Sequence, residues 1–363
     1  MTFYRVNDAS GVAASADLAQ GRRIGTVRRL TFASTLALLT ACGGSVSENA
    51  SLDGGPSPDA RHGDPDASPD ADAGSPTCRV GGGTVVTLAS GMNQPWGLAV
   101  DGEYVYWTVN GDGLVLKTPV GGGAISTLAS DQDGPTQIVV DHTTAYWVTM
   151  SSLESVSLSG GGTTPIATAP STAYGSLTLA GGELYWSEEP YGSYSGSIVA
   201  RSAGGTLTTL ATNQTQPGDV VFDESRLYWN NESPYGSFSV LSVSPAGGSV
   251  TTLVTSDNED LVAALAGNLY LEGGDDLFRQ PLDGGAATKM VSNLSAQSVA
   301  IDSENLYWAT YSAIKCVPLV GGRVVTLVSG PGGISRSGAI AVDATSVYWT
   351  DQSGGYVAKA SKL

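Results

Sequence analysis

A Tyr-Trp dipeptide recurs along this chain at nearly fixed intervals. Six copies are intact, and in a seventh the Trp is replaced by Leu. Successive tyrosines lie 40, 39, 43, 42, 37 and 41 residues apart. The seven pairs are Tyr106-Trp107, Tyr146-Trp147, Tyr185-Trp186, Tyr228-Trp229, Tyr270-Leu271, Tyr307-Trp308 and Tyr348-Trp349. A period of about 40 residues is the length of one four-stranded blade, so the repeat predicts an all-β, seven-bladed β-propeller.

The residues within each repeat are typical of strands and tight turns. Short runs of Val, Ile, Thr and Tyr alternate with Gly, Pro, Asn and Asp. Glycine pairs such as Gly121-Gly122 and Gly321-Gly322 suit the positive φ angles of hairpin turns. Adjacent Tyr and Trp point to opposite faces of one strand. We therefore expect that strand to be buried on both faces, as in a blade packed between two neighbours.

The two ends of the repeat array are complementary. Residues 84–88 form a strand-like run with no Tyr-Trp strand before it, whereas the last repeat stops before its own fourth strand. We predict that this N-terminal run pairs near residues 356–360 and closes the ring, which removes two free sheet edges.

An Asp stands five residues before the Tyr in five of the seven repeats. Its place between two strands predicts a structural role, in which the carboxylate accepts backbone N–H groups of the turn. Metal binding is the alternative. The five residues are Asp101, Asp141, Asp223, Asp302 and Asp343.

The repeat resembles the YWTD repeat of the low-density lipoprotein receptor class of propellers. Tyr348-Trp349-Thr350-Asp351 matches that motif at all four positions, and residues 106–108 match three of them. The resemblance covers residues 84–363 and implies propeller architecture. That family is usually six-bladed, so the count of seven places closer kinship with other bacterial Tyr-Trp repeat propellers. The receptor functions of the family depend on partners that this sequence does not show.

The N-terminal residues have the pattern of a secretion signal followed by a spacer. Four arginines precede the apolar run 30–39, which ends in Leu39-Thr40-Ala41-Cys42. This order predicts a signal peptide over residues 1–41, although the start is overlong and translation from near Val27 is an alternative. The ending resembles the lipobox of bacterial lipoproteins, in which Cys42 is lipidated; a plain secretory signal is the other interpretation. Gly43 in place of Asp favours, by that resemblance, the outer over the inner membrane.

Residues 42–83 carry the lipidated Cys and a Pro-, Asp- and Ala-rich stretch that cannot bury a core. We predict a disordered, extended tether, followed by the propeller over residues 84–363. The two other cysteines, Cys78 and Cys316, fall in neighbouring blades of the predicted ring. They either form a disulfide or remain two buried thiols.

Charge narrows the class of partner. The net charge of −17 argues against nucleic acid and anionic lipid and favours cationic or calcium-bearing partners. We expect a monomer that meets the membrane only through its anchor, in the cell envelope. Only two histidines, His62 and His142, are present, which argues against a His-based triad or zinc site.

The loops that follow Trp186 and Trp229 are longer than their counterparts and resemble each other. Together with the fifth repeat, they predict an acidic, aromatic arc on one face of the ring. The alternative is that these are long hairpins which pack on each other. The candidate binding residues are Glu188, Glu189, Tyr191, Tyr194, Glu232, Tyr235, Phe238, Glu272, Asp275 and Asp276, with Asp257, Glu259 and Asp260 in an adjoining loop.

Two functions remain open at this point. The first is a membrane-tethered, extracytoplasmic binding or scaffold propeller for a protein or carbohydrate ligand, with no catalytic residue and no assigned cofactor. The second is a calcium-dependent hydrolase or lyase with a carboxylate-lined central channel.

Overall fold

The computed structural model describes residues 31–32, 78, 84–168, 172–223, 225–234, 236–256, 259–329 and 337–362. Cys42 and most of the predicted tether lie outside these residues. Within the described ranges the secondary structure is strand and turn. No helix in this part of the chain is long and apolar enough to cross a membrane.

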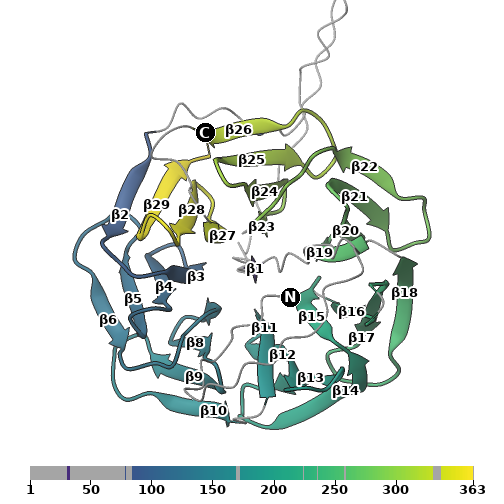
Figure 1. The fold of residues 1–363 in the computed structure, drawn as a ribbon, viewed down its shortest axis with the longest axis horizontal. Coiled ribbons are helices and arrows are strands. Elements are labelled where there is room, and N and C mark those ends of the chain that lie inside the picture. Colours follow the sequence, from purple (N-terminus) through teal and green to yellow (C-terminus); the bar gives the residue numbers. More distant parts are fainter. Residues whose placement is uncertain are drawn as a thin grey trace, which may run out of the picture.

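Seven antiparallel, four-stranded sheets surround a common axis as the blades of a propeller (Figure 1). This confirms the predicted fold class and blade count. From the inner to the outer strand, blade 1 comprises β3 (Pro95–Val100), β4 (Tyr104–Val109), β5 (Leu114–Pro119) and β6 (Ser126–Ala129). Blade 2 comprises β7 (Ile138–Val140), β8 (Thr144–Val148), β9 (Ser152–Ser157) and β10 (Thr164–Thr168). Blade 3 comprises β11 (Thr172–Ala180), β12 (Glu183–Pro190), β13 (Ser195–Arg201) and β14 (Leu207–Thr215).

The remaining four blades follow the same order. Blade 4 comprises β15 (Pro217–Phe222), β16 (Leu227–Glu232), β17 (Phe238–Val243) and β18 (Thr251–Ser256). Blade 5 comprises β19 (Glu259–Leu265), β20 (Asn268–Gly273), β21 (Asp276–Pro281) and β22 (Thr288–Val291). Blade 6 comprises β23 (Ser298–Ile301), β24 (Asn305–Ala309), β25 (Ala313–Pro318) and β26 (Val325–Ser329), and blade 7 comprises β27 (Ser337–Val342), β28 (Ser346–Asp351), β29 (Tyr356–Ser361) and β2 (Val86–Ser90). The two-residue strand β1 (Thr31–Phe32) pairs in parallel with β23.

The Tyr-Trp pairs form the contacts between blades. Trp107 and Tyr106 are both buried, as expected for a strand covered on both faces. Trp107 packs with Tyr348 of blade 7, whereas Tyr106 packs with Trp147 of blade 2. Each tyrosine therefore faces the next blade and each tryptophan faces the previous one.

The same arrangement repeats at all seven interfaces. Each hydrophobic cluster contains the tyrosine of one blade and the tryptophan of the next, with Leu271 in the tryptophan's place in blade 5. The remaining pairs are Tyr146 with Trp186, Tyr185 with Trp229, Tyr228 with Leu271, Tyr270 with Trp308, and Tyr307 with Trp349. One Leu fits because the position requires a large apolar group rather than an aromatic ring.

The ring closes as the sequence predicts. Strand β2 pairs in antiparallel fashion with β29, with Val86 opposite Lys359 and Ser90 opposite Tyr356. Figure 1 shows β2 beside β29 at the outer edge of blade 7. The strand begins two residues later than expected, at Val86 rather than at Thr84.

The upstream Asp holds the turn between the first two strands, as predicted. In blade 7, Asp343 Oδ1 accepts the N–H groups of Thr345 (2.7 Å) and Ser346 (2.8 Å), and Oδ2 accepts the hydroxyl of Tyr348 (2.6 Å). The other four repeats with Asp make the same Asp–Tyr hydrogen bond. Burial alone would raise the pKa of Asp343, but the hydrogen bonds from Tyr348, Thr345 and Ser346 outweigh it and lower that pKa.

The two blades without this Asp use a different turn. In blade 3, Ala180 pairs directly with Glu183, so the connection shrinks to Gly181 and Gly182, which both have positive φ. Blade 5 does the same with Ala266 and Gly267. Two successive positive φ angles are the mark of a tight two-residue hairpin, which needs no side-chain acceptor.

Side chains opposite the tyrosines connect neighbouring blades. Lys117, opposite Tyr106, donates to the carbonyl of Leu158 in blade 2 at 2.6 Å. Equivalent bonds run from Arg279 to the Leu319 carbonyl (3.0 Å) and from Lys359 to the Val120 carbonyl (2.6 Å).

In blade 6 the equivalent position, opposite Tyr307, is Cys316. Its sulfur is bonded to that of Cys78, and the two Cα atoms are 6.1 Å apart, within the usual range for a disulfide. Of the two alternatives left open by the sequence, the structure contains the disulfide.

Candidate functional site

The loops between the second and third strands of the blades lie at one end of the ring, which we call the hairpin face. Loops that enter the next blade lie at the same end. The Gln216 N–H, just before β15, donates to the Tyr194 carbonyl in the β12–β13 loop (3.1 Å), and the Leu294 N–H donates to the Asp275 carbonyl in the β20–β21 loop. The candidate residues that the structure describes are therefore all carried on this face or at the strand ends beside it.

Blade 3 extends furthest at the hairpin face because its extra residues lengthen the strands. Strand β12 runs eight residues to Pro190, and β13 begins at Ser195, which leaves a four-residue loop. Tyr191 and Tyr194 occupy this tip with 60% and 56% of their surfaces exposed. The repeat tyrosines, by contrast, are buried or partly buried between the blades.

Blade 2 supplies a contact that the sequence did not predict. The Tyr191 hydroxyl donates to the backbone carbonyl of Met150 at 2.9 Å, and Met150 itself is 54% exposed in the β8–β9 loop. We call Met150, Tyr191 and Tyr194 the tyrosine ledge. The sequence feature that could have indicated this contact is Met150, a large apolar residue in the otherwise polar loop Thr149-Met150-Ser151-Ser152.

The two acidic residues at the base of the ledge differ in role. Glu188 accepts the indole N–H of Trp186 at 3.2 Å, so it also serves the core. Burial, followed by the charge of Glu188, raises the pKa of Tyr174 to about 12. Glu189 follows on the opposite side of β12 and is partly exposed. The ledge is therefore apolar and aromatic with carboxylates beside it.

The candidate residues of blade 4 are less exposed than those of blade 3. Glu232 ends β16 and Phe238 begins β17, and both are partly buried. The loop between them is closed by hydrogen bonds from the Ser233 N–H to the Ser237 carbonyl and from the Gly236 N–H to the Ser233 carbonyl. Tyr235 lies outside the described residues, as does Asp257.

Blade 5 contributes carboxylates of two kinds. Asp276 forms an ion pair with Lys289 across its own sheet, so its charge is compensated. Asp275 lies in the β20–β21 turn, and Glu272 lies on β20 directly opposite Asp260 of β19.

Asp260 is the most strongly perturbed of these acids. Burial raises its pKa, the Leu261 N–H opposes that shift, and the charge of Glu232 adds to it, which brings the pKa to about 7. The predicted arc thus divides into the ledge on blades 2 and 3 and an acidic cluster (Glu232, Asp260 and Glu272) on blades 4 and 5.

The described residues contain no group of three His, Cys, Asp or Glu side chains able to hold a metal ion. His142, the one histidine in the described ranges, is exposed on the turn between β7 and β8. That turn joins the first and second strands of blade 2, so it lies at the opposite end of the ring from the hairpin face.

Comparisons with known proteins show the fold and no family. No family model and no curated protein matches the chain. Among solved structures, virginiamycin B lyase from Staphylococcus aureus is similar with a TM-score of 0.61 at 12% identity, over 77% of this chain and 98% of that one. A gluconolactonase from Xanthomonas campestris is similar with a TM-score of 0.53 at 12% identity, over 78% and 91% of the two chains.

A third structure bears on the YWTD resemblance. The nidogen–laminin complex matches at 20% identity over 53% of this chain and 79% of that one, but its TM-score of 0.42 is too low to support an argument. At these identities the comparisons establish a shared propeller architecture. They do not transfer a ligand or a reaction.

The raised pKa of Asp260 predicts a pH-dependent effect of Asp260→Asn. Because the folded-state pKa lies above the ordinary value of 3.8, the contribution of Asp260 to stability is fully present below about pH 3.8 and is lost as the pH rises from there to about 7. The neutral amide should therefore stabilise the protein more at pH 8.5 than at pH 5, by a difference of about 2 kcal/mol. Denaturant unfolding at the two pH values measures this. Asp131→Asn, at an exposed turn, is the control, and an equal effect of Asp260→Asn at both pH values would contradict the assignment.

Proposed function

We propose that this protein is a binding module of the cell envelope, whose propeller is held near a membrane by a lipid on Cys42 and binds its partner with the tyrosine ledge. The observation that carries the proposal is the exposure of Met150, Tyr191 and Tyr194 on neighbouring blades of one face. Tyrosine is enriched in protein interfaces because it offers a large apolar surface with a polar tip. The hydrogen bond from Tyr191 to Met150 fixes the ledge before binding, which lowers the entropy that association costs.

The charge around the ledge supports a cationic partner. The sequence contains no Lys or Arg between Lys117 and Arg201, whereas seven acidic residues fall in that stretch. Two of the seven, Asp141 and Glu183, lie at the opposite end of the ring, which leaves five for the rest of blades 2 and 3. The stretch spans blade 2 and most of blade 3, which carry the ledge. Tyrosine faces attract Lys and Arg side chains, and nearby carboxylates add to that attraction. We therefore favour a Lys- or Arg-bearing segment of a protein over a neutral carbohydrate.

The double substitution Tyr191→Ala with Tyr194→Ala tests the ledge. We expect a cationic probe, such as a decamer of arginine, to bind about 2 kcal/mol more weakly to the variant, because both aromatic faces are lost. The melting temperature should change little, since exposed substitutions usually cost about 0.5 kcal/mol or less. Isothermal titration and thermal unfolding on the same sample measure both quantities.

Tyr311→Ala is the matched control, because Tyr311 is also 56% exposed and lies in the β24–β25 loop of blade 6. It should leave affinity unchanged. Equal binding by the parent, the double variant and the control would show that charge alone attracts the probe and would refute the ledge. If a neutral oligosaccharide bound and its binding depended on the two tyrosines, the ligand would be a carbohydrate and the cationic protein partner would be wrong.

Lipidation of Cys42 is tested separately from binding. Cys42→Ser should release the protein from the membrane fraction and from the detergent phase in partitioning experiments, because the sulfur that would carry the lipid is lost. Ala41→Gly, which keeps a small residue before the cysteine, should behave as the parent. Identical partitioning of Cys42→Ser and the parent would exclude the anchor and leave a plain secretory signal.

The catalytic alternative has weaker support. Virginiamycin B lyase has also been solved as a catalytically inactive variant, with a histidine replaced by alanine, in the presence of quinupristin. In the described part of this chain the one histidine, His142, is exposed on the face opposite the hairpin loops. A calcium-dependent reaction would instead need carboxylates that hold the ion together, and the described residues contain no group of three that could do so. The similarity of the fold to the lyase and the gluconolactonase is the observation that supports an enzymatic function.

A further inference from the structure

The predicted tether joins the propeller next to β2, the outer strand that closes the ring. Strand β2 is the outermost strand of blade 7 and pairs only with β29. Of its five residues, only Leu88 and Ala89 are buried. A pull on the tether that reached β2 would therefore act on one ladder of hydrogen bonds with little apolar burial behind it.

The register makes this ladder weak against such a pull. Val86, where the chain enters β2, lies opposite Lys359, near the end of β29. The incoming chain and the C-terminus thus leave the sheet at the same end. Tension between them peels the strands apart and breaks the hydrogen bonds one after another rather than together. Opening this ladder would open the ring, because β2 supplies the fourth strand of blade 7.

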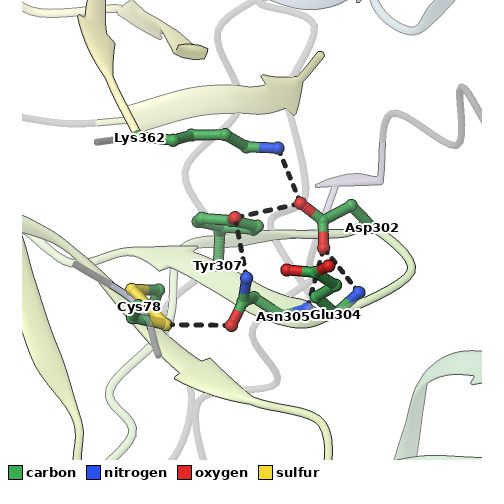
Figure 2. Close-up of a disulfide and its surroundings, with 7 residues drawn as sticks. Cys78, Asp302, Glu304, Asn305, Tyr307 and Lys362 are labelled. Carbon is green, nitrogen blue, oxygen red and sulfur yellow. Dashed lines mark hydrogen bonds and ion pairs between the residues drawn. A yellow bond between two sulfur atoms is a disulfide. The ribbon is translucent and has the colours of Figure 1, made fainter. Parts of the chain in front are cut away.

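The disulfide lies upstream of that weak point. Cys78 precedes β2, and its partner Cys316 lies in β25, a strand flanked on both sides by β24 and β26. Cys316 is fully buried in the core cluster shared by blades 6 and 7. Figure 2 shows the bridge beside Asn305, whose side-chain oxygen is 3.3 Å from the Cys78 sulfur.

The C-terminus is fastened to the same blade. The Lys362 ammonium forms an ion pair with Asp302 at 2.6 Å and lies 5.0 Å from the centre of the Tyr307 ring (Figure 2). Cys78 and Lys362 are therefore both held by blade 6, one through a covalent bond and one through a partly buried ion pair.

We propose that the Cys78–Cys316 disulfide is a mechanical clip, which passes tension from the tether directly into blade 6 so that the tension bypasses the closing strand β2. The bridge spans 238 positions of sequence and encloses everything from β2 to β24. Tension applied before Cys78 reaches β25 and cannot extend the enclosed residues while the bond is intact.

The comparison between blades supports a mechanical role. Blades 1, 5 and 7 carry Lys117, Arg279 or Lys359 at the position of Cys316, and each makes one hydrogen bond to a backbone carbonyl of the next blade. Among the described residues, this connection is covalent only in blade 6, where Cys316 is bonded to Cys78 beside the entry of the tether. The proposal rests on the tether described above and not on the identity of the ligand.

Single-molecule pulling on the full chain, held by its two ends in an optical trap, tests the clip. With the bridge intact, only the 46 residues from Val317 to Lys362 can be released from the propeller, which corresponds to about 160 Å of extended chain. After dithiothreitol is added to the same molecule, a first event at lower force should free β2, and the total release should rise to about 1,000 Å.

The variant Cys78→Ser with Cys316→Ser controls for the reductant, since it should behave as the reduced protein with or without dithiothreitol. A total release well above 160 Å from the oxidised protein would show that the bridge is absent. A first event at the same force before and after reduction would show that the bridge carries no load. Neither result depends on lipidation of Cys42 or on ligand binding, so the failure of those proposals would be seen separately.

Discussion

The packing of a tyrosine from one blade against a tryptophan from the next is the interaction on which this structure depends. It occurs at the interfaces all round the ring, with Leu271 as the one substitution among the tryptophans. Because the two residues are adjacent on one strand, they point to opposite faces, and each second strand is fixed to both neighbouring blades. Burying such large side chains on both faces leaves the loops at the two ends free to vary in length and chemistry.

That freedom, and the place where the proposed tether enters the ring, bear on the proposed binding surface. Cys78, which precedes β2, and Lys362, which follows β29, are both held by blade 6, through Cys316 and through Asp302. Figure 1 shows blade 3 on the far side of the ring from blade 6. The tyrosine ledge, on blades 2 and 3, therefore lies across the ring from blade 6 (Figure 1). A module tethered through blade 6 would present the ledge, with its cation-free surroundings, away from the attachment point.

Sequence reasoning recovered the fold because its signals were periodic. The spacing of the Tyr-Trp pairs gave the blade count, and the incomplete repeats at the two ends gave the pairing of β2 with β29. The role of Asp343 followed from its place in a turn. Contacts that occur once could not be found this way. The bond from Tyr191 to Met150 joins two loops of different blades, and the raised pKa of Asp260 depends first on its burial and then on the charge of Glu232 in another blade. The disulfide stayed open because sequence gives no distance between Cα atoms.

Closure of the ring by β2 is the central structural claim, and amide hydrogen exchange tests it most directly. The amides of β29 that face β2, such as those of Val357 and Lys359, should exchange as slowly as amides in the interior of a blade. They should be slower than the outward-facing amides of an edge strand such as β22. Exchange of these β29 amides at the edge-strand rate, in the oxidised protein under native conditions, would contradict closure and with it the seven-bladed ring that supports every other conclusion.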